Sequence, residues 1–249
     1  MRRRVACASL SLLLATGCAT SSARPTDGPL VDTTCADVVV LGIRGSGQAA
    51  DLNRGVGKEV VRTVTALARR VESRAEASVR LEAVRYDASG TATDPSYLEH
   101  VTAGARLVAR HADDLVRQCP DTRIGVVGFS QGAQVVHAFA DDVRPDVARH
   151  VVLIGLIADP RRNPDDRIRH WSYTDRMVPR PGLLGAGPPI DADVRATAIS
   201  FCNAADEVCN GRGIRGEKTS AAHRFFYEEP AHVRSTAEQL DIVLRANGV

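Results

Sequence analysis

Residues 123–140 have the sequence RIGVVGFSQGAQVVHAFA. The segment 123–128 is a short apolar run that suits a buried parallel strand, and the end of the stretch suits a helix. Between them, GFSQG at 128–132 fits the G-x-S-x-G pattern, in which a nucleophilic serine occupies a tight turn between strand and helix. The two glycines lack a Cβ, so strand and helix can approach closely around a strained serine. We therefore interpret Ser130 as a nucleophile; the alternative is a glycine-rich turn whose serine only caps the helix.

The rest of the chain alternates between strand-like and helix-like segments. Apolar runs predict four further strands, at 36–43, 79–86, 147–157 and 196–201. Apolar residues at helical spacing predict three further helices, at 52–74, 97–117 and 233–246. We therefore expect a three-layer α/β/α fold with a central, mainly parallel, five-stranded sheet. Its site should lie at the carboxyl ends of the strands, framed by the long Pro- and Gly-rich connection 159–194.

A serine hydroxyl is a weak nucleophile that needs a base, and the base needs a carboxylate to orient it. In a fold of this kind the acid follows the last strand and the histidine follows the acid. Asp206 follows the last predicted strand and lies between Cys202 and Cys209, where a short disulfide loop would hold its carboxylate in place. We expect Asp206 to be the acid, with Glu207 as its nearest rival. Two acids between the serine and the last strand rank lower: Asp159 and Asp175.

Two histidines follow Asp206. His223 precedes the closing helix and is our candidate base, while His232, at the start of that helix, is the alternative. Histidines that precede the acid are expected to be surface or packing residues: His111, His137, His150 and His170.

Backbone N–H groups must also face the negative charge that develops on the substrate. We expect one from Gln131, the residue after the nucleophile, and one from Ser46 in the glycine-rich segment GIRGSG at 42–47. A phosphate-binding loop is the alternative, but the segment has neither G-x-G-x-x-G nor a P-loop lysine.

Cysteine usage fits an oxidising compartment. Cys7 and Cys18 belong to the N-terminal segment, and the remaining four allow three pairings. Cys202 and Cys209 close a tight local loop, so we pair them and pair Cys35 with Cys119. Zinc is the competing interpretation, but no C-x-x-C pair is present, and we expect no metal.

The N-terminus predicts export. Residues 1–4 are basic and residues 5–17 form a short apolar run, which is typical of a signal peptide. Cys18 follows a sequence similar to a bacterial lipoprotein signal and is a lipidation candidate; cleavage after residues 21–23 is the alternative. The expected division is a signal peptide at 1–23, a flexible linker at 24–34 and a folded domain at 35–249. We expect the protein to be secreted, or anchored to the outside of the cell membrane through Cys18.

The charge pattern argues against a nucleic-acid partner. The chain carries 32 Lys and Arg against 30 Asp and Glu, for a net charge of +2. Because the acids are interspersed with the arginines, no basic patch for nucleic acid is predicted. We expect no nucleic-acid partner, and a monomer.

Together these residues resemble the cutinase family, in particular its small secreted actinobacterial members. The motifs are RGSG at 44–47, GFSQGA at 128–133, Asp159-Pro160, and Asp206 between its two cysteines. The resemblance implies a compact α/β-hydrolase fold that needs no metal and no cofactor and hydrolyses carboxylic esters. It also implies a site open to solvent and disulfides that join the first cysteine of the domain to the second and the third to the fourth.

We therefore expect an esterase that hydrolyses esters with short to medium acyl chains, polyesters such as cutin among them. It would use Ser130, His223 and Asp206. Alternatives are a polysaccharide deacetylase of the acetylxylan esterase type, and a lipase, phospholipase or thioesterase acting on cell-envelope lipids. The alternative that is not an enzyme is an anchored binding protein with a degenerate site. One departure from the family is the 17-residue gap between Asp206 and His223, which is longer than usual.

Overall fold

The computed structural model of the protein describes residues 29–75, 77–174, 177–211 and 219–249. The predicted signal peptide, the lipidation candidate Cys18 and the acid Asp175 lie outside these residues.

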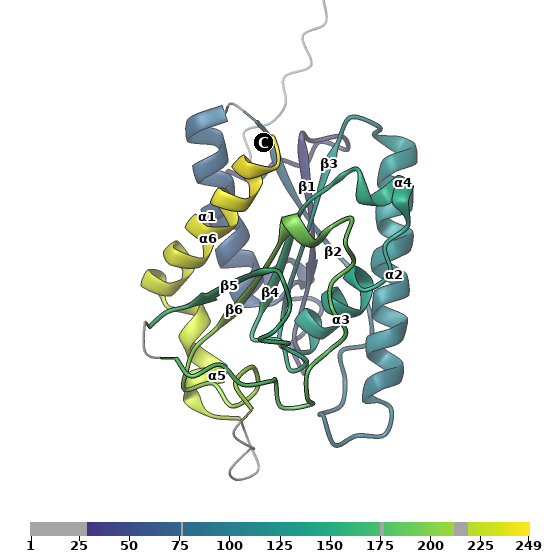
Figure 1. Ribbon diagram of the computed structural model, residues 1–249. Coiled ribbons are helices and arrows are strands. Elements are labelled where there is room, and N and C mark those ends of the chain that lie inside the picture. The colour runs from purple at the N-terminus through teal and green to yellow at the C-terminus, as the bar shows by residue number, and fades with distance from the viewer. Residues whose placement is uncertain (1–28, 76, 175–176, 212–218) are drawn as a thin grey trace, which may run out of the picture.

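The described residues form a central sheet of parallel strands in the order β2-β1-β3-β4-β6-β5 (Figure 1). The strands are β1 (Val38–Ile43), β2 (Val79–Ala83), β3 (Arg123–Phe129), β4 (Val151–Ile157), β5 (Arg169–Ser172) and β6 (Ala198–Cys202). The predicted parallel sheet is confirmed, but it has six strands rather than five. The additional strand is β5, an edge strand inside the connection 159–194. Its first two residues are exposed, so it lacks the apolar run that marks the buried strands.

Helices cover both faces of the sheet, with α1 and α6 on one side and α2, α3 and α4 on the other (Figure 1). The helices are α1 (Lys58–Ala75), α2 (Tyr97–Gln118), α3 (Gln131–Ala140), α4 (Pro145–Ala148), α5 (Ala221–Phe225) and α6 (Pro230–Ala246). Short 3₁₀ turns are η1 (Asn53–Gly55), η2 (Arg195–Thr197) and η3 (Phe226–Glu228). Helix α1 begins at Lys58 rather than at residue 52, because Asn53 and Arg54 adopt positive φ, which a right-handed helix excludes.

Helix α1 illustrates how the sequence builds these layers. Val60, Val64, Leu67 and Val71 recur at helical spacing, and all four are fully buried. They belong to the core between the sheet and the α1–α6 layer, and a second core lies under α2 and α3. Burial of each such side chain contributes about 1.5–3 kcal/mol. The sheet is therefore well packed on both faces, and it fixes the positions from which the loops at the carboxyl ends of its strands begin.

The folded part of the chain begins before Cys35. Leu30, which the sequence places in the linker 24–34, is only 4% exposed. It forms a parallel bridge with Val79 of β2, and the N–H of Val31 donates to the carbonyl oxygen of Val79 at 2.9 Å. These contacts cover part of the edge strand β2.

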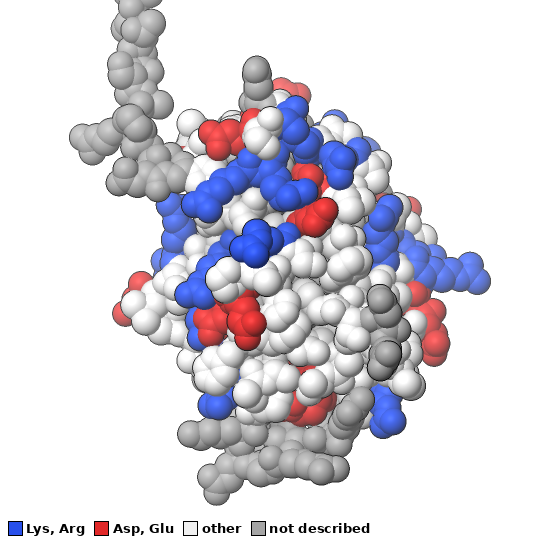
Figure 2. Space-filling model, turned by 90° about the vertical axis from the view of Figure 1, so that its left-hand side faces the viewer, with Lys and Arg blue, Asp and Glu red and all other residues white. Residues whose placement is uncertain are grey.

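Basic side chains gather on the outer side of α1 and α6 (Figure 2). Among them, Arg70 and Arg74 of α1 and Arg245 of α6 form ion pairs with Asp241 of α6, at 3.6, 2.8 and 3.5 Å. Asp241 is almost fully buried, and a buried carboxylate is stable only when it is paired. The cluster therefore fastens the last helix to the first.

Two disulfides pair the cysteines as expected from the sequence. Cys35 is bonded to Cys119, at the amino ends of β1 and β3, and Cys202 is bonded to Cys209 after β6. Within the described part of the chain, no helix combines the length and the apolar composition that a membrane span requires. The same residues contain no group of three or more His, Cys, Asp or Glu arranged to hold a metal ion.

Candidate active site

Ser130 occupies a strained turn between β3 and α3. Its φ is +55°, a conformation that costs a residue with a side chain about 1–3 kcal/mol. The flanking glycines are required by contact: a Cβ on Gly128 would lie 2.3 Å from the carbonyl oxygen of Gly132, and one on Gly132 would lie 2.3 Å from that of Ile43. The hydroxyl of Ser130 makes no capping bond to α3, so the alternative of a simple helix cap is wrong.

The structure brings Ser130, His223 and Asp206 into one hydrogen-bonded chain. His223 Nε2 lies 3.0 Å from Ser130 Oγ, and His223 Nδ1 lies 3.1 Å from both carboxylate oxygens of Asp206. Asp206 is fully buried and His223 is 6% exposed. The imidazole also stacks on Phe129 of β3, with ring centroids 5.0 Å apart. Its plane is thus fixed by a carboxylate on one edge and by an aromatic ring on one face.

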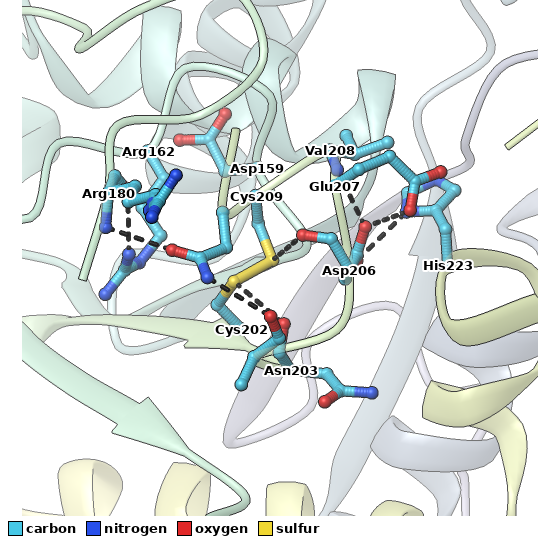
Figure 3. Close-up of a disulfide and its surroundings, with 12 residues drawn as sticks. Asp159, Arg162, Arg180, Cys202, Asn203, Asp206, Glu207, Val208, Cys209 and His223 are labelled. Carbon is cyan, nitrogen blue, oxygen red and sulfur yellow. Dashed lines mark hydrogen bonds and ion pairs between the residues drawn. A yellow bond between two sulfur atoms is a disulfide. The ribbon is translucent and has the colours of Figure 1, made fainter. Parts of the chain in front are cut away.

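The Cys202–Cys209 disulfide lies beside Asp206, whose carboxylate points toward His223 (Figure 3). Two other donors hold the same carboxylate: the N–H of Val208 at 2.9 Å and the hydroxyl of Tyr227 at 2.8 Å. Burial, and after it the neighbouring Asp206 charge, raises the pKa of Tyr227 well above its usual value. The phenol therefore stays protonated and remains a donor.

Sequence reasoning did not find Tyr227. This residue lies in η3, and its fully buried side chain contacts Asp206. Its hydroxyl also accepts a hydrogen bond from the N–H of Asn203 at 2.9 Å. The aromatic run at 225–227 was a compositional signal, but nothing local indicated which ring would turn inward.

The rival acid Glu207 has a different partner. Its two carboxylate oxygens accept hydrogen bonds from the N–H and the hydroxyl of Ser220, at 2.6 and 2.5 Å. Ser220 in turn caps α5, because its hydroxyl oxygen accepts from the N–H of His223 at 3.3 Å. Glu207 therefore holds the start of the helix that carries His223. Serine is a common residue at a helix N-cap, so Ser220 was a local signal for α5, although the sequence predicted a loop there.

The rival base His232 lies in the first turn of α6. Its ring stacks on Phe226 with centroids 3.5 Å apart, and its Nδ1 lies 2.9 Å from the carbonyl oxygen of Phe226. These contacts are those of a packing residue.

His137 is buried in α3 against the low-ranked acid Asp159. Its Nδ1 lies 2.6 Å from Asp159 Oδ2, and its Nε2 lies 2.8 Å from the carbonyl oxygen of Pro188. Burial alone would lower the pKa of His137, but the Asp159 carboxylate raises it to about 9. Both ring nitrogens face acceptors, so the imidazolium form fits the site. The pair fastens the long connection 159–194 to α3, in agreement with the packing role expected of His137.

Three other histidines that precede the acid also have local partners other than the serine. His111 contacts Glu82 at 3.2 Å, His150 contacts the carbonyl oxygen of Thr122 at 3.3 Å, and His170 contacts that of Asp166 at 3.0 Å.

The two expected sources of N–H groups are Gln131, which directly follows Ser130, and Ser46, which lies in the segment after β1. The N–H of Gln131 is the first of α3, so the helix offers it no acceptor. Ser46 lines the same cleft as Ser130, and its hydroxyl donates to the carbonyl oxygen of Gly90. Within the described residues, the backbone N–H of Ser46 has no acceptor. Neither main-chain N–H is therefore engaged by another described residue.

A cleft of about 820 Å³ opens over Ser130 and His223. Apolar side chains in its wall come from strand ends, from loops and, for Phe225, from helix α5: Ala92, Phe129, Pro160, Leu183, Val208 and Phe225. A hydroxyl nucleophile, an imidazole and a buried carboxylate in this order are the groups needed for acyl transfer from an ester to water.

Comparison with known proteins agrees with this chemistry. The sequence pattern of the cutinase family matches residues 34–235. Carboxylesterase Culp1 of Mycobacterium tuberculosis is 29% identical over 179 residues, which cover 72% of this chain and 71% of the relative. Cutinase CUT2 of Pyricularia oryzae is 27% identical over 231 residues, which cover 86% of this chain and 90% of the relative.

Solved structures share the fold at lower identity. The catalytic core domain of acetyl xylan esterase from Trichoderma reesei has a TM-score of 0.63 at 18% identity, covering 86% of this chain and 99% of its own. A cutinase-like protein from Cryptococcus sp. also has a TM-score of 0.63, at 17% identity, covering 84% of this chain and 95% of its own. The fold is thus that of the α/β-hydrolases. Since the family pattern matches most of the sequence, the chain belongs to the cutinase family of carboxylic ester hydrolases.

Proposed function

We propose that the protein is a serine esterase with Ser130 as nucleophile, His223 as base and Asp206 as the acid that orients the base. The observation that carries the proposal is the 3.0 Å contact between His223 Nε2 and Ser130 Oγ at the floor of an open cleft. His223 takes the serine proton as Ser130 Oγ attacks the ester carbonyl. Asp206 keeps the other ring nitrogen protonated and stabilises the imidazolium that forms.

The tetrahedral oxyanion then rests on the N–H groups of Ser46 and Gln131. His223 returns its proton to the leaving alcohol, and the acyl group stays on Ser130. Water next attacks the acyl-enzyme with His223 again as base, releasing the carboxylic acid and restoring the serine.

We propose esters with short to medium acyl chains as substrates, polyesters such as cutin among them. The cleft is far larger than an acetyl group requires, and its apolar side chains suit a short alkyl chain. Cleavage of acetyl groups from a polysaccharide is a second candidate, because the hydroxyls of Thr91, Thr93 and Thr219 also line the cleft and can bind a sugar.

The test is hydrolysis of p-nitrophenyl esters from acetate to palmitate by wild type, Ser130→Ala and His223→Ala. Both variants should lose several orders of magnitude in kcat. His232→Ala is the matched control and should keep near-normal turnover. The assignment of the base fails if His232→Ala is inactive and His223→Ala is not. A rate that rises from acetyl to butyryl supports the esterase, whereas activity confined to acetyl supports the deacetylase and a maximum at palmitate supports a lipase.

We also propose that the protein works outside the cytoplasm as a monomer, secreted or tethered to the membrane through a lipid on Cys18. Two disulfides support an oxidising compartment, where such bonds persist. Mass spectrometry of the mature N-terminus would distinguish a lipidated Cys18 from cleavage after residues 21–23.

A further inference from the structure

The loop that carries Ser46 is held by a chain of side-chain hydrogen bonds that reaches α1. The N–H of Gly45 donates to Gln48 Oε1 at 2.7 Å, and Gln48 Nε2 donates to Glu59 Oε2 at 2.6 Å. This orientation of the Gln48 amide is the one that satisfies both neighbours, since an N–H needs an acceptor and a carboxylate needs a donor. Glu59 is thus linked through Gln48 to Gly45, the residue that precedes Ser46.

The backbone is shaped to admit this link. Gly57, just before α1, has a φ of +80°, and a Cβ built on it would lie 2.0 Å from Gln48 Oε1. A side chain at position 57 would therefore displace the Gln48 amide. Glu59 is only 2% exposed but contributes to the wall of the cleft. A carboxyl group in such a place has lost most of its water and depends on Gln48 as a partner.

We propose that Glu59 is a positioning residue for the oxyanion hole, acting through Gln48 to aim the Ser46 N–H at the oxygen of the bound ester. The inference rests on the esterase function proposed above. An ionised Glu59 only accepts hydrogen bonds, so it holds the amide group of Gln48 toward itself and leaves Oε1 for the Gly45 N–H. A protonated Glu59 carries an O–H donor, so the Gln48 amide can turn over and accept that bond through Oε1. The Gly45 N–H then faces Nε2 and has no acceptor, which releases the loop.

The surroundings of Glu59 favour its protonated form more than water does. Burial raises its pKa, and hydrogen bonding by Gln48 opposes that shift. Two charged groups act on it: Lys58, adjacent in α1, and Glu228 of η3, which is itself ion-paired with Lys58 at 2.6 Å. From α5, His223 and Arg224 line the same cleft.

The experiment measures kcat and KM on p-nitrophenyl butyrate between pH 4.5 and 8 for wild type, Glu59→Gln and Gln48→Leu. Loss of one oxyanion donor costs about 10²–10³ in kcat, and a loop that is only misaimed should lose about tenfold. We expect that loss in Gln48→Leu with little change in KM. Glu59→Gln keeps a neutral acceptor for Gln48, so it should lose less and should also lose one ionisation from the acid limb of the pH profile. The matched control Glu82→Gln, on β2, should behave as wild type.

Equal kcat values in all four proteins would overturn the proposal. So would a lower melting temperature of Glu59→Gln with an unchanged pH profile, since that is the mark of a purely structural role. If wild type itself fails to turn over, the proposed function fails, and amide hydrogen exchange of residues 44–48 then decides about Glu59. Faster exchange in Glu59→Gln and Gln48→Leu than in Glu82→Gln supports the link, and equal exchange contradicts it.

Discussion

Single atoms decide how firmly Asp206 is held. Its carboxylate faces His223 Nδ1 and accepts bonds from the Val208 N–H and the Tyr227 hydroxyl. A buried carboxylate is stable only when such donors replace water. Because the Tyr227 hydroxyl also serves the Asn203 N–H, its removal disturbs two buried polar groups at once.

Tyr227→Phe should therefore lower stability by about 1–3 kcal/mol and kcat by about tenfold, which corresponds to about 1.4 kcal/mol in the transition state. Urea unfolding and turnover of p-nitrophenyl butyrate measure the two effects. Tyr173→Phe is the matched control, because the Tyr173 hydroxyl is bonded to Thr236 Oγ1 at 2.6 Å and not to the Asp206 loop. It should lose stability and keep kcat; equal turnover in the two variants would contradict a role for Tyr227 in holding Asp206.

At this scale the sequence was enough to name the three side chains that meet. A short motif marks Ser130, and the order of acid and histidine along the chain follows from the fold. Tyr227 and Ser220 were not named, because their roles depend on contacts with residues distant in sequence. Tyr227 contacts Asp206, 21 residues earlier, and Ser220 contacts Glu207, 13 residues earlier. No local pattern records such contacts.

Among the elements, α3 contacts the long connection after β4 through His137, two turns beyond Ser130. His137 on α3 faces Asp159 and the carbonyl oxygen of Pro188, so it ties the long connection after β4 to the helix that begins at the nucleophile. The folded-state pKa of His137 is about 9, against an ordinary value of 6.5. Its contribution to stability is therefore complete below pH 6.5 and is lost as the pH rises through about 9.

Wild type should lose up to about 3 kcal/mol of unfolding free energy from this pair between pH 6.5 and pH 10. The double variant His137→Gln with Asp159→Asn keeps the shape of the pair without a titrating group, so it should lack this share of the pH dependence. Urea denaturation at several pH values compares them. His150→Gln, which removes only a contact with the carbonyl oxygen of Thr122, should follow wild type. Parallel stability curves for wild type and the double variant would contradict an imidazolium at this site.

Elements with strong apolar patterns were predicted, and elements without them were not. Strands β1, β3, β4 and β6 are buried along nearly their whole length, so their apolar composition identifies them as strands in the sequence. Among the described residues, strand β5 has four residues and pairs only with β6. Helix α5 has five residues and depends on Ser220 for its start. Tertiary contacts, rather than propensity, form these short elements.

Across the whole molecule, the two disulfides lie at opposite ends of the strands. Cys35–Cys119 joins the amino ends of β1 and β3, far from the cleft, and closes 84 residues of sequence. Cys202–Cys209 follows the carboxyl end of β6 and closes only 7 around Asp206. In the chain-entropy treatment, the long loop contributes about 4.5 kcal/mol to stability and the short loop about 2.5 kcal/mol. The bridge that contributes less to folding is thus the one next to the proposed acid.

Removal of the two bridges should therefore separate stability from activity. Cys35→Ser with Cys119→Ser should show the larger fall in melting temperature, with kcat near normal below the transition, because the sheet still sets the carboxyl-end loops. Cys202→Ser with Cys209→Ser should show the smaller fall in melting temperature but the larger fall in kcat, because Asp206 then lies on an unconstrained loop. Melting curves measure the stability of both variants. Their kcat is measured 20 °C below the melting temperature of the less stable variant. If kcat falls equally in the two variants, the short bridge has no special part in holding Asp206, and the contacts from Tyr227 and Val208 are sufficient to fix it.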